Sequence, residues 1–164
     1  MAIMETNIGN SIAGGWFNGL LAGLAGGAAE VGWIALYSGL TGGDGIAVAN
    51  GVTASVVPAA AGTAIAVPLG LAIHFGLAIA LGLAVAVMLR RIVPQLAGSM
   101  AELGLIVAVL ATVWAVNFLI ILPVLNPAFV HVVPLPVSFI SKLLFGLAAA
   151  LVLRMKSDRS AQQT

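Results

Sequence analysis

The chain has 164 residues, of which 62% are hydrophobic and only 7% are charged, and its mean hydropathy is +1.19. Because soluble domains contain about 25% charged residues, this composition indicates a protein surrounded by lipid. The net charge of +1 gives no indication of nucleic-acid binding, which needs a basic stripe, and the absence of cysteine excludes disulfides and thiolate metal sites. No Lys or Arg precedes residue 15, so we expect the first apolar stretch to be a retained helix and not a cleaved signal peptide.

Four apolar stretches are long enough to cross a bilayer as helices. They cover residues 15–38, 63–89, 102–122 and 134–153. Each reaches the roughly 20 residues that span ~30 Å of hydrocarbon, and a helix satisfies its own backbone hydrogen bonds there. We therefore predict an all-α integral membrane protein, with a four-helix transmembrane bundle over residues 15–154.

The basic residues indicate the orientation of these spans. Arg90 and Arg91 lie between the second and third spans, and Arg154 begins a basic stretch after the fourth. The other two connections contain no Lys or Arg, so the positive-inside rule places both termini and the central connection in the cytoplasm. We expect residues 1–14 to form a cytoplasmic segment and residues 155–164 to form a disordered cytoplasmic tail.

Small residues recur at a spacing of four along three of the spans, a pattern typical of membrane helices that pack closely. The first span has four such glycines, and the second and fourth spans have small residues on either side of His74 and Lys142. We therefore expect two packed helical hairpins. The predicted helix-packing residues are Gly15, Gly19, Gly23, Gly27, Gly70, Gly82 and Gly146.

A short internal repeat fits the arrangement in two hairpins. The sequence FGLA at residues 75–78 returns at residues 145–148, and each copy lies in the second helix of its pair. A repeat after two spans keeps its orientation, so its copies would be related by an axis along the membrane normal. Segments rich in Ala, Leu and Gly also match by chance, and the sequence leaves both explanations open.

Each span carries one strongly polar side chain: Glu30, His74, Asn117 and Lys142. At 1.5 Å per residue, all four lie ~18–24 Å from the cytoplasmic ends of their spans, within about one helical turn of each other. His74 and Lys142 lie on the small-residue stripes and Glu30 lies beside one, so these three are expected to face protein. We predict a single polar cluster with a Glu30–Lys142 ion pair, flanked by His74 and Asn117 as hydrogen-bond partners.

Several roles fit such a cluster, because an ionisable group inside a bilayer is costly unless it is paired or used. It could lock the helices in register or dock a partner subunit. It could also move protons or a small solute. A haem or metal site is a remote alternative, because His131 lies ~11 Å beyond His74 by residue count and no metal-binding spacing is present. We predict no cofactor, no metal and no catalytic residue.

Four further segments are informative when they are taken together. They are AEVGWIALY at residues 29–37, WAVNF at 114–118, LNPAFVH at 125–131 and SKLLFG at 141–146. In these segments the chain resembles small four-helix inner-membrane proteins of proteobacteria that carry no assigned function. The resemblance implies a bacterial inner (plasma) membrane and supplies no activity.

We predict a non-enzymatic polytopic inner-membrane protein that is an accessory or assembly subunit of a larger membrane complex, or a homo-oligomer. Its expected partners are the lipid bilayer and other membrane subunits or further copies of the chain, because four striped helices offer more close-packing surface than one small bundle uses. No Gly-x-Ser-x-Gly elbow or phosphate-binding loop indicates an enzyme. The alternative is a small proton-coupled transporter or channel that uses Glu30, His74 and Lys142.

Overall fold

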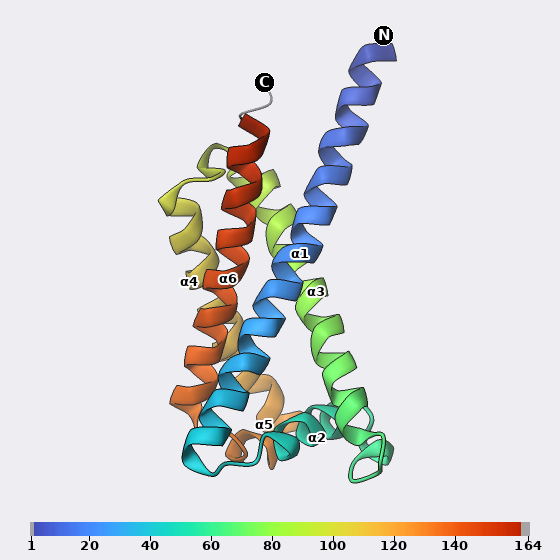
Figure 1. The fold of residues 1–164 in the computed structure, drawn as a ribbon, viewed down its shortest axis with the longest axis vertical. Helices are drawn as coiled ribbons and strands as arrows, with labels where there is room; N and C mark the ends of the chain where they lie inside the picture. The colour runs from blue at the N-terminus through green and yellow to red at the C-terminus, as the bar shows by residue number, and fades with distance from the viewer. Residues whose placement is uncertain (1, 162–164) are drawn as a thin grey trace.

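The computed structural model describes the backbone of residues 2–161 and the side chains of residues 15–155, and this part of the chain contains helices and no strand (Figure 1). The α-helices are α1 (Ala2–Thr41), α2 (Gly45–Val56), α3 (Ala66–Ile92), α4 (Met100–Val116), α5 (Leu122–Leu125) and α6 (Leu135–Ala161). Between them lie the short 3-10 turns η1 (Pro58–Ala60), η2 (Pro94–Leu96) and η4 (Phe129–His131), and the π-helical turn η3 (Asn117–Ile121). The predicted all-α fold is confirmed.

Four stretches of helix are long and apolar enough to cross a membrane. They are Gly15–Thr41, Ala66–Ile92, Met100–Leu125 and Leu135–Met155. The chain is therefore a multi-pass membrane protein. The first and last helices extend beyond these stretches, since α1 begins at Ala2 and α6 ends at Ala161.

The C-terminal end of the chain thus differs from the expected disordered tail. Helix α1 includes residues 2–14, and α6 includes most of the tail predicted to be disordered, residues 155–161. No Gly or Pro follows Gly146, so the sequence contains no residue that would end α6 earlier. Residue 1 and residues 162–164 lie outside the described part.

The long helices form two hairpins that pack side by side. Helix α1 packs against both α3 and α6, and α4 packs against α6. Helix α1 begins and α6 ends at the same end of the bundle, where η2 lies between α3 and α4 (Figure 1). We call this the basic end, because Arg90, Arg91 and Arg154 lie there. The predicted pair of packed hairpins is confirmed.

A hydrophobic core fills the half of the bundle nearer the basic end. It consists of Ala22, Ala78, Val85, Ala86, Leu89, Ile106, Leu110, Phe145, Ala149, Ala150 and Leu153. Buried Glu102 at the start of α4 lies 3.6 Å from Arg90 of α3 and accepts a hydrogen bond from the Gly98 N–H at 2.6 Å. Ser99 caps α4 by accepting from the Glu102 N–H at 3.1 Å. The serine cap, the Gly98–Glu102 hydrogen bond and the ion pair together close this end of the bundle.

Facing glycines allow α1 and α3 to approach closely. A methyl group on Gly23 would lie 2.5 Å from the carbonyl oxygen of Ala78, and one on Gly82 would lie 2.5 Å from the Cα of Gly23. Gly19 and Gly27 meet α3 in the same way, with atoms at 3.0 Å and 2.8 Å from the added methyl. These glycines act as the small-residue stripe predicts.

The remaining predicted packing glycines differ from one another. A methyl group on Gly146 would lie 3.3 Å from Val107 of α4, and Gly70 packs against the backbone of α2 and not against another long helix. A methyl group on Gly15 would have nothing within 4 Å, because α1 diverges from α3 toward the basic end (Figure 1). The prediction that Gly15 packs against a helix is therefore corrected, and the close approach begins at Gly19.

Helix α4 gives way to the π-helical turn η3 before the span ends. The Leu122 N–H bonds to the Asn117 carbonyl, five residues earlier. Pro123 has no N–H, and in a regular α-helix its ring would clash with the carbonyl four residues earlier, so a wider turn accommodates it. The turn changes the direction in which residues 117–121 point relative to α4.

Helix α2 lies across the opposite end of the bundle, which we call the α2 end (Figure 1). The Asp44 carboxylate caps its first turn. Buried Thr53 donates a hydrogen bond of 2.5 Å to the Ala66 carbonyl and so ties α2 to α3. Asn126 donates to the Ser55 hydroxyl at 3.0 Å and ties α2 to the connection before α6. These long-range hydrogen bonds, together with the packing of α2 against α3, hold α2 in place.

Glycine-to-alanine substitutions on α3 test the close approach of α1 and α3. Gly82→Ala should destabilise the fold by about 1–3 kcal/mol, because the added methyl group meets the α1 backbone. Gly76→Ala is the matched control on the same helix, since its added methyl has nothing within 4 Å, and its stability should stay within about 1 kcal/mol of the parent. SDS-induced unfolding in mixed micelles measures both, and equal losses would contradict the packing.

Candidate functional site

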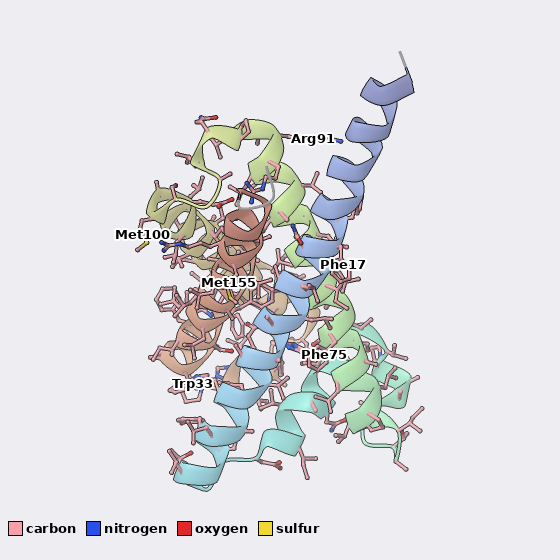
Figure 2. All side chains as sticks on the ribbon, turned by 45° about the horizontal axis from the view of Figure 1, so that its top comes forward. Phe17, Trp33, Phe75, Arg91, Met100 and Met155 are labelled. Atoms are coloured by element: carbon pink, nitrogen blue, oxygen red, sulfur yellow. The ribbon has the colours of Figure 1, made fainter. Side chains whose placement is uncertain are left out.

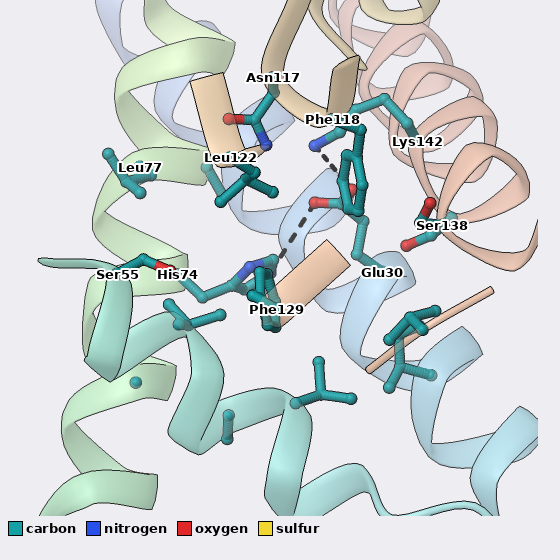
Figure 3. Close-up of a pocket in the computed structure, with 18 of the residues that line it drawn as sticks. Glu30, Ser55, His74, Leu77, Asn117, Phe118, Leu122, Phe129, Ser138 and Lys142 are labelled. Atoms are coloured by element: carbon teal, nitrogen blue, oxygen red, sulfur yellow. Dashed lines mark ion pairs between the residues drawn. The ribbon is translucent and has the colours of Figure 1, made fainter. Parts of the chain in front are cut away.

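The four predicted polar residues line one cavity (Figure 3). It has a volume of about 770 Å³, and α1, α2, α3, α6 and the α4–η3–α5 segment all contribute to its wall. Glu30, His74, Asn117 and Lys142 come from four different helical segments and meet there. Four side chains that residue counting places at one depth thus surround one space.

Glu30 joins three helices through its carboxylate. Its Oε1 lies 2.7 Å from Nζ of Lys142 on α6, and its Oε2 lies 3.9 Å from Nε2 of His74 on α3. The Glu30 side chain is 9% exposed and the Lys142 side chain 17%, so both charges are largely withdrawn from the surroundings. A buried charge without its partner is far less stable than the pair, so each of these residues requires the other.

The backbone of α1 orients His74. Its Nε2 lies 3.2 Å from the Gly27 carbonyl oxygen. Because a carbonyl oxygen only accepts, this contact places the imidazole hydrogen on Nε2. The distance of 3.9 Å from Nε2 to Glu30 is too long for a hydrogen bond, so His74 is an electrostatic neighbour of the carboxylate and is hydrogen-bonded to the Gly27 backbone. The predicted role of His74 as a hydrogen-bond partner of the ion pair is therefore corrected.

The aromatic ring of Phe145 lies next to the Lys142 ammonium. The Lys142 Nζ lies 5.0 Å from the centroid of the Phe145 ring, a distance at which a cation is attracted to an aromatic face. Phe145 is 1% exposed and lies against Gly26 of α1, where an added methyl group would be 2.7 Å from the ring. Gly26 is not among the predicted packing residues, although it lies next to Gly27, because it faces α6 and not α3.

Asn117 lines the cavity but does not join the ion pair. It is the first residue of η3, and its amide points into the cavity (Figure 3). Among the described residues its side chain has no recorded hydrogen bond, so its predicted role as a hydrogen-bond partner of the pair is corrected. Glu30 and Lys142 contact each other directly, which leaves the Asn117 amide free to face the cavity.

Two tryptophans tie the wall of the cavity to α6. Trp114 donates from Nε1 to the Ser138 hydroxyl at 3.0 Å and stacks on Phe118 at 5.7 Å between ring centroids. Trp33 donates from Nε1 to the Val137 carbonyl at 3.0 Å and links α1 to the first turn of α6 (Figure 2). These contacts are not among the predicted site residues, although Ser138 lies on the same small-residue stripe as Lys142.

The two histidines do not meet. His131 lies in η4, is exposed, and is not among the residues that line the cavity. Within residues 15–155 no three potential metal ligands gather at one place. The cavity therefore offers one ion pair, one imidazole, one amide and the hydroxyl groups of Ser55, Thr112, Ser138 and Ser141.

A double-mutant cycle tests the mutual dependence of Glu30 and Lys142. Glu30→Gln or Lys142→Met alone should destabilise the protein by about 3–5 kcal/mol, because each leaves one buried charge uncompensated. The double variant should lose less than the sum of the two. Unfolding free energies in mixed micelles provide the measurement, and additive losses would reject the coupling.

Comparison with known proteins finds no family model that matches the chain, no similar curated protein and no similar solved structure. The resemblance to small proteobacterial inner-membrane proteins therefore stays a prediction.

Proposed function

We propose that the protein is a non-enzymatic membrane component in which Glu30 locks α1, α3 and α6 into one unit. The contact of 2.7 Å between Glu30 and Lys142 is the observation that carries this proposal. It joins the first and last helices, which are far apart in sequence, at a position where neither charge is stable alone. In this proposal the polar residues hold the helices together and do not carry out a reaction.

We further propose that this unit is an accessory or assembly subunit of a larger membrane complex. The unequal burial of the helices supports this, since the most apolar windows of α1 and α6 are each 33% buried, whereas those of α3 and α4 are 22% and 17% buried. The faces of α3 and α4 are thus available to lipid or to helices of a partner. In this proposal the protein lies in a bacterial inner membrane with its basic end in the cytoplasm.

Proton-coupled transport is the second candidate. It is favoured by one observation, the position of the Glu30 carboxylate between Lys142 and His74 on the wall of a cavity of about 770 Å³. Titratable groups placed together inside a membrane are the parts of a proton relay.

Reconstitution separates the two candidates. For an accessory subunit, proton and solute flux through liposomes that hold the pure protein should equal that of empty liposomes. The variant Glu30→Gln/Lys142→Met, which removes both charges together, should weaken co-purification with partner subunits in mild detergent. Gly76→Ala serves as the control that leaves co-purification unchanged.

The opposite result has a clear form. A flux that requires the protein and disappears in Glu30→Gln would overturn the accessory role and establish the transport role. If the double variant co-purifies with partner subunits as strongly as the parent does, the Glu30–Lys142 pair is not required for assembly with a partner.

A further inference from the structure

We infer that the cavity binds one neutral amphiphile of the membrane, a molecule with a carbonyl-bearing head and an apolar tail, which enters sideways between α3 and α4. This binding activity goes beyond the helix lock, because the lock requires only the contact between Glu30 and Lys142. Three features carry the inference: the size of the cavity, its apolar mouth, and the unused hydrogen-bond donors on its wall.

The cavity has the dimensions of a small-molecule site. Its volume of about 770 Å³ falls within the roughly 300–1,000 Å³ of such sites. Most of its wall is aliphatic, with the aromatic rings of Phe118 and Phe129 added. The polar side chains on the wall are Glu30, His74, Asn117, Lys142, Ser55, Thr112, Ser138 and Ser141. A mostly apolar pocket with a few convergent polar groups is the form that small-molecule sites commonly take.

The mouth of the cavity opens between α3 and the α4–η3–α5 segment. Helices α3 and α4 pack against α1 and α6 and have little contact with each other outside the basic end, where Arg90 meets Glu102. Several residues of the cavity wall are also exposed on the outside of the bundle. They are Val56, Leu71, Leu77, Val116, Ile121 and Leu125.

These six residues are apolar, and most of them lie within the membrane-spanning stretches. Thr112 of α4 also lines the cavity and is exposed, but its hydroxyl donates to the Ala108 carbonyl of its own helix. The mouth therefore opens toward the hydrocarbon, and a molecule dissolved in the bilayer can reach the cavity without crossing water. An apolar tail fits the mouth, where it can remain in contact with lipid while the head lies deeper.

The polar groups inside the cavity match a head that accepts hydrogen bonds. A lysine ammonium has three N–H donors, and among the described residues the recorded ion-pair partner of Lys142 is Glu30 alone. The Asn117 amide points into the same space and adds two N–H donors (Figure 3). A carbonyl oxygen on the ligand would accept hydrogen bonds from the Asn117 amide and from the N–H groups of Lys142 that do not face Glu30.

The charges favour a neutral head over an anionic one. The Glu30 and Lys142 charges offset each other at 2.7 Å. An anionic head would therefore be attracted only weakly to Lys142 and would be repelled by the neighbouring Glu30 carboxylate. A carbonyl avoids this repulsion. Two kinds of membrane molecule supply a neutral carbonyl head, namely a quinone ring and a glycerol ester, and the experiment distinguishes them.

The test titrates the full chain in lipid nanodiscs with three probes: decylubiquinone, dioctanoylglycerol and dioctanoyl phosphatidic acid. Quenching of tryptophan fluorescence follows the quinone, and competition against the quinone or calorimetry follows the other two. We expect saturable binding of one molecule per chain for a neutral probe. The probe that binds identifies the source of the carbonyl, and the phosphatidic acid should bind at least tenfold more weakly.

Two kinds of variant locate the binding site. Asn117→Leu leaves the Glu30–Lys142 pair in place and should weaken binding by about fivefold to tenfold, the effect of one lost hydrogen bond. Ile121→Trp fills the mouth and should weaken binding more than tenfold. Ile120→Trp is its matched control, because Ile120 lies on the same turn, is 62% exposed and does not line the cavity.

Three results would overturn the inference. They are the absence of saturable binding for both neutral probes, tighter binding of the phosphatidic acid than of either neutral probe, and equal affinities in Ile121→Trp and Ile120→Trp. The last comparison stays informative even if Asn117→Leu does not fold, because the two tryptophan variants differ only in which side of one turn they enlarge.

Discussion

The Glu30 carboxylate, buried between Lys142 and His74, is the interaction on which the arrangement of the helices depends. A carboxylate inside a bilayer is stable only with compensating charge, so α6 must bring Lys142 to α1. The glycines of α1 make this possible on two faces of the helix. Gly27 lets α3 approach closely, and Gly26 leaves room for the Phe145 ring, which lies next to the Lys142 ammonium. The close helix packing at Gly26 and Gly27 and the ion pair of Glu30 with Lys142 thus lie in the same part of α1 and depend on each other.

The bundle divides into two halves with different properties. Near the basic end a continuous hydrophobic core and the Arg90–Glu102 pair close the space between α3 and α4. Toward the α2 end the same helices separate, and the cavity occupies the gap. The closed half holds the helices in register, and the open half has the space and the unpaired donors that binding requires.

Much of this architecture could be predicted from the sequence, because hydropathy predicts the membrane spans and the spacing of small residues predicts where helices pack closely. Counting residues was sufficient to pair Glu30 with Lys142. Counting also placed Asn117 at the level of the cavity, but depth alone does not show which side chains touch, and Asn117 forms no contact with the ion pair. The spacing of the glycines likewise did not show the contacts of Gly15 and Gly26, which depend on how α1 crosses its neighbours. The cavity arises from the divergence of two helices, which no local pattern records.

The position of Glu30 in the first helix and Lys142 in the last has a consequence for biogenesis. At synthesis rates of ~5–20 residues per second, Lys142 leaves the ribosome on the order of 5–20 s after Glu30. During that interval the α1–α3 hairpin can offer the carboxylate only His74, at 3.9 Å. The first hairpin therefore completes its burial only when the last helix arrives, and the final step of membrane insertion is also the step that neutralises its interior.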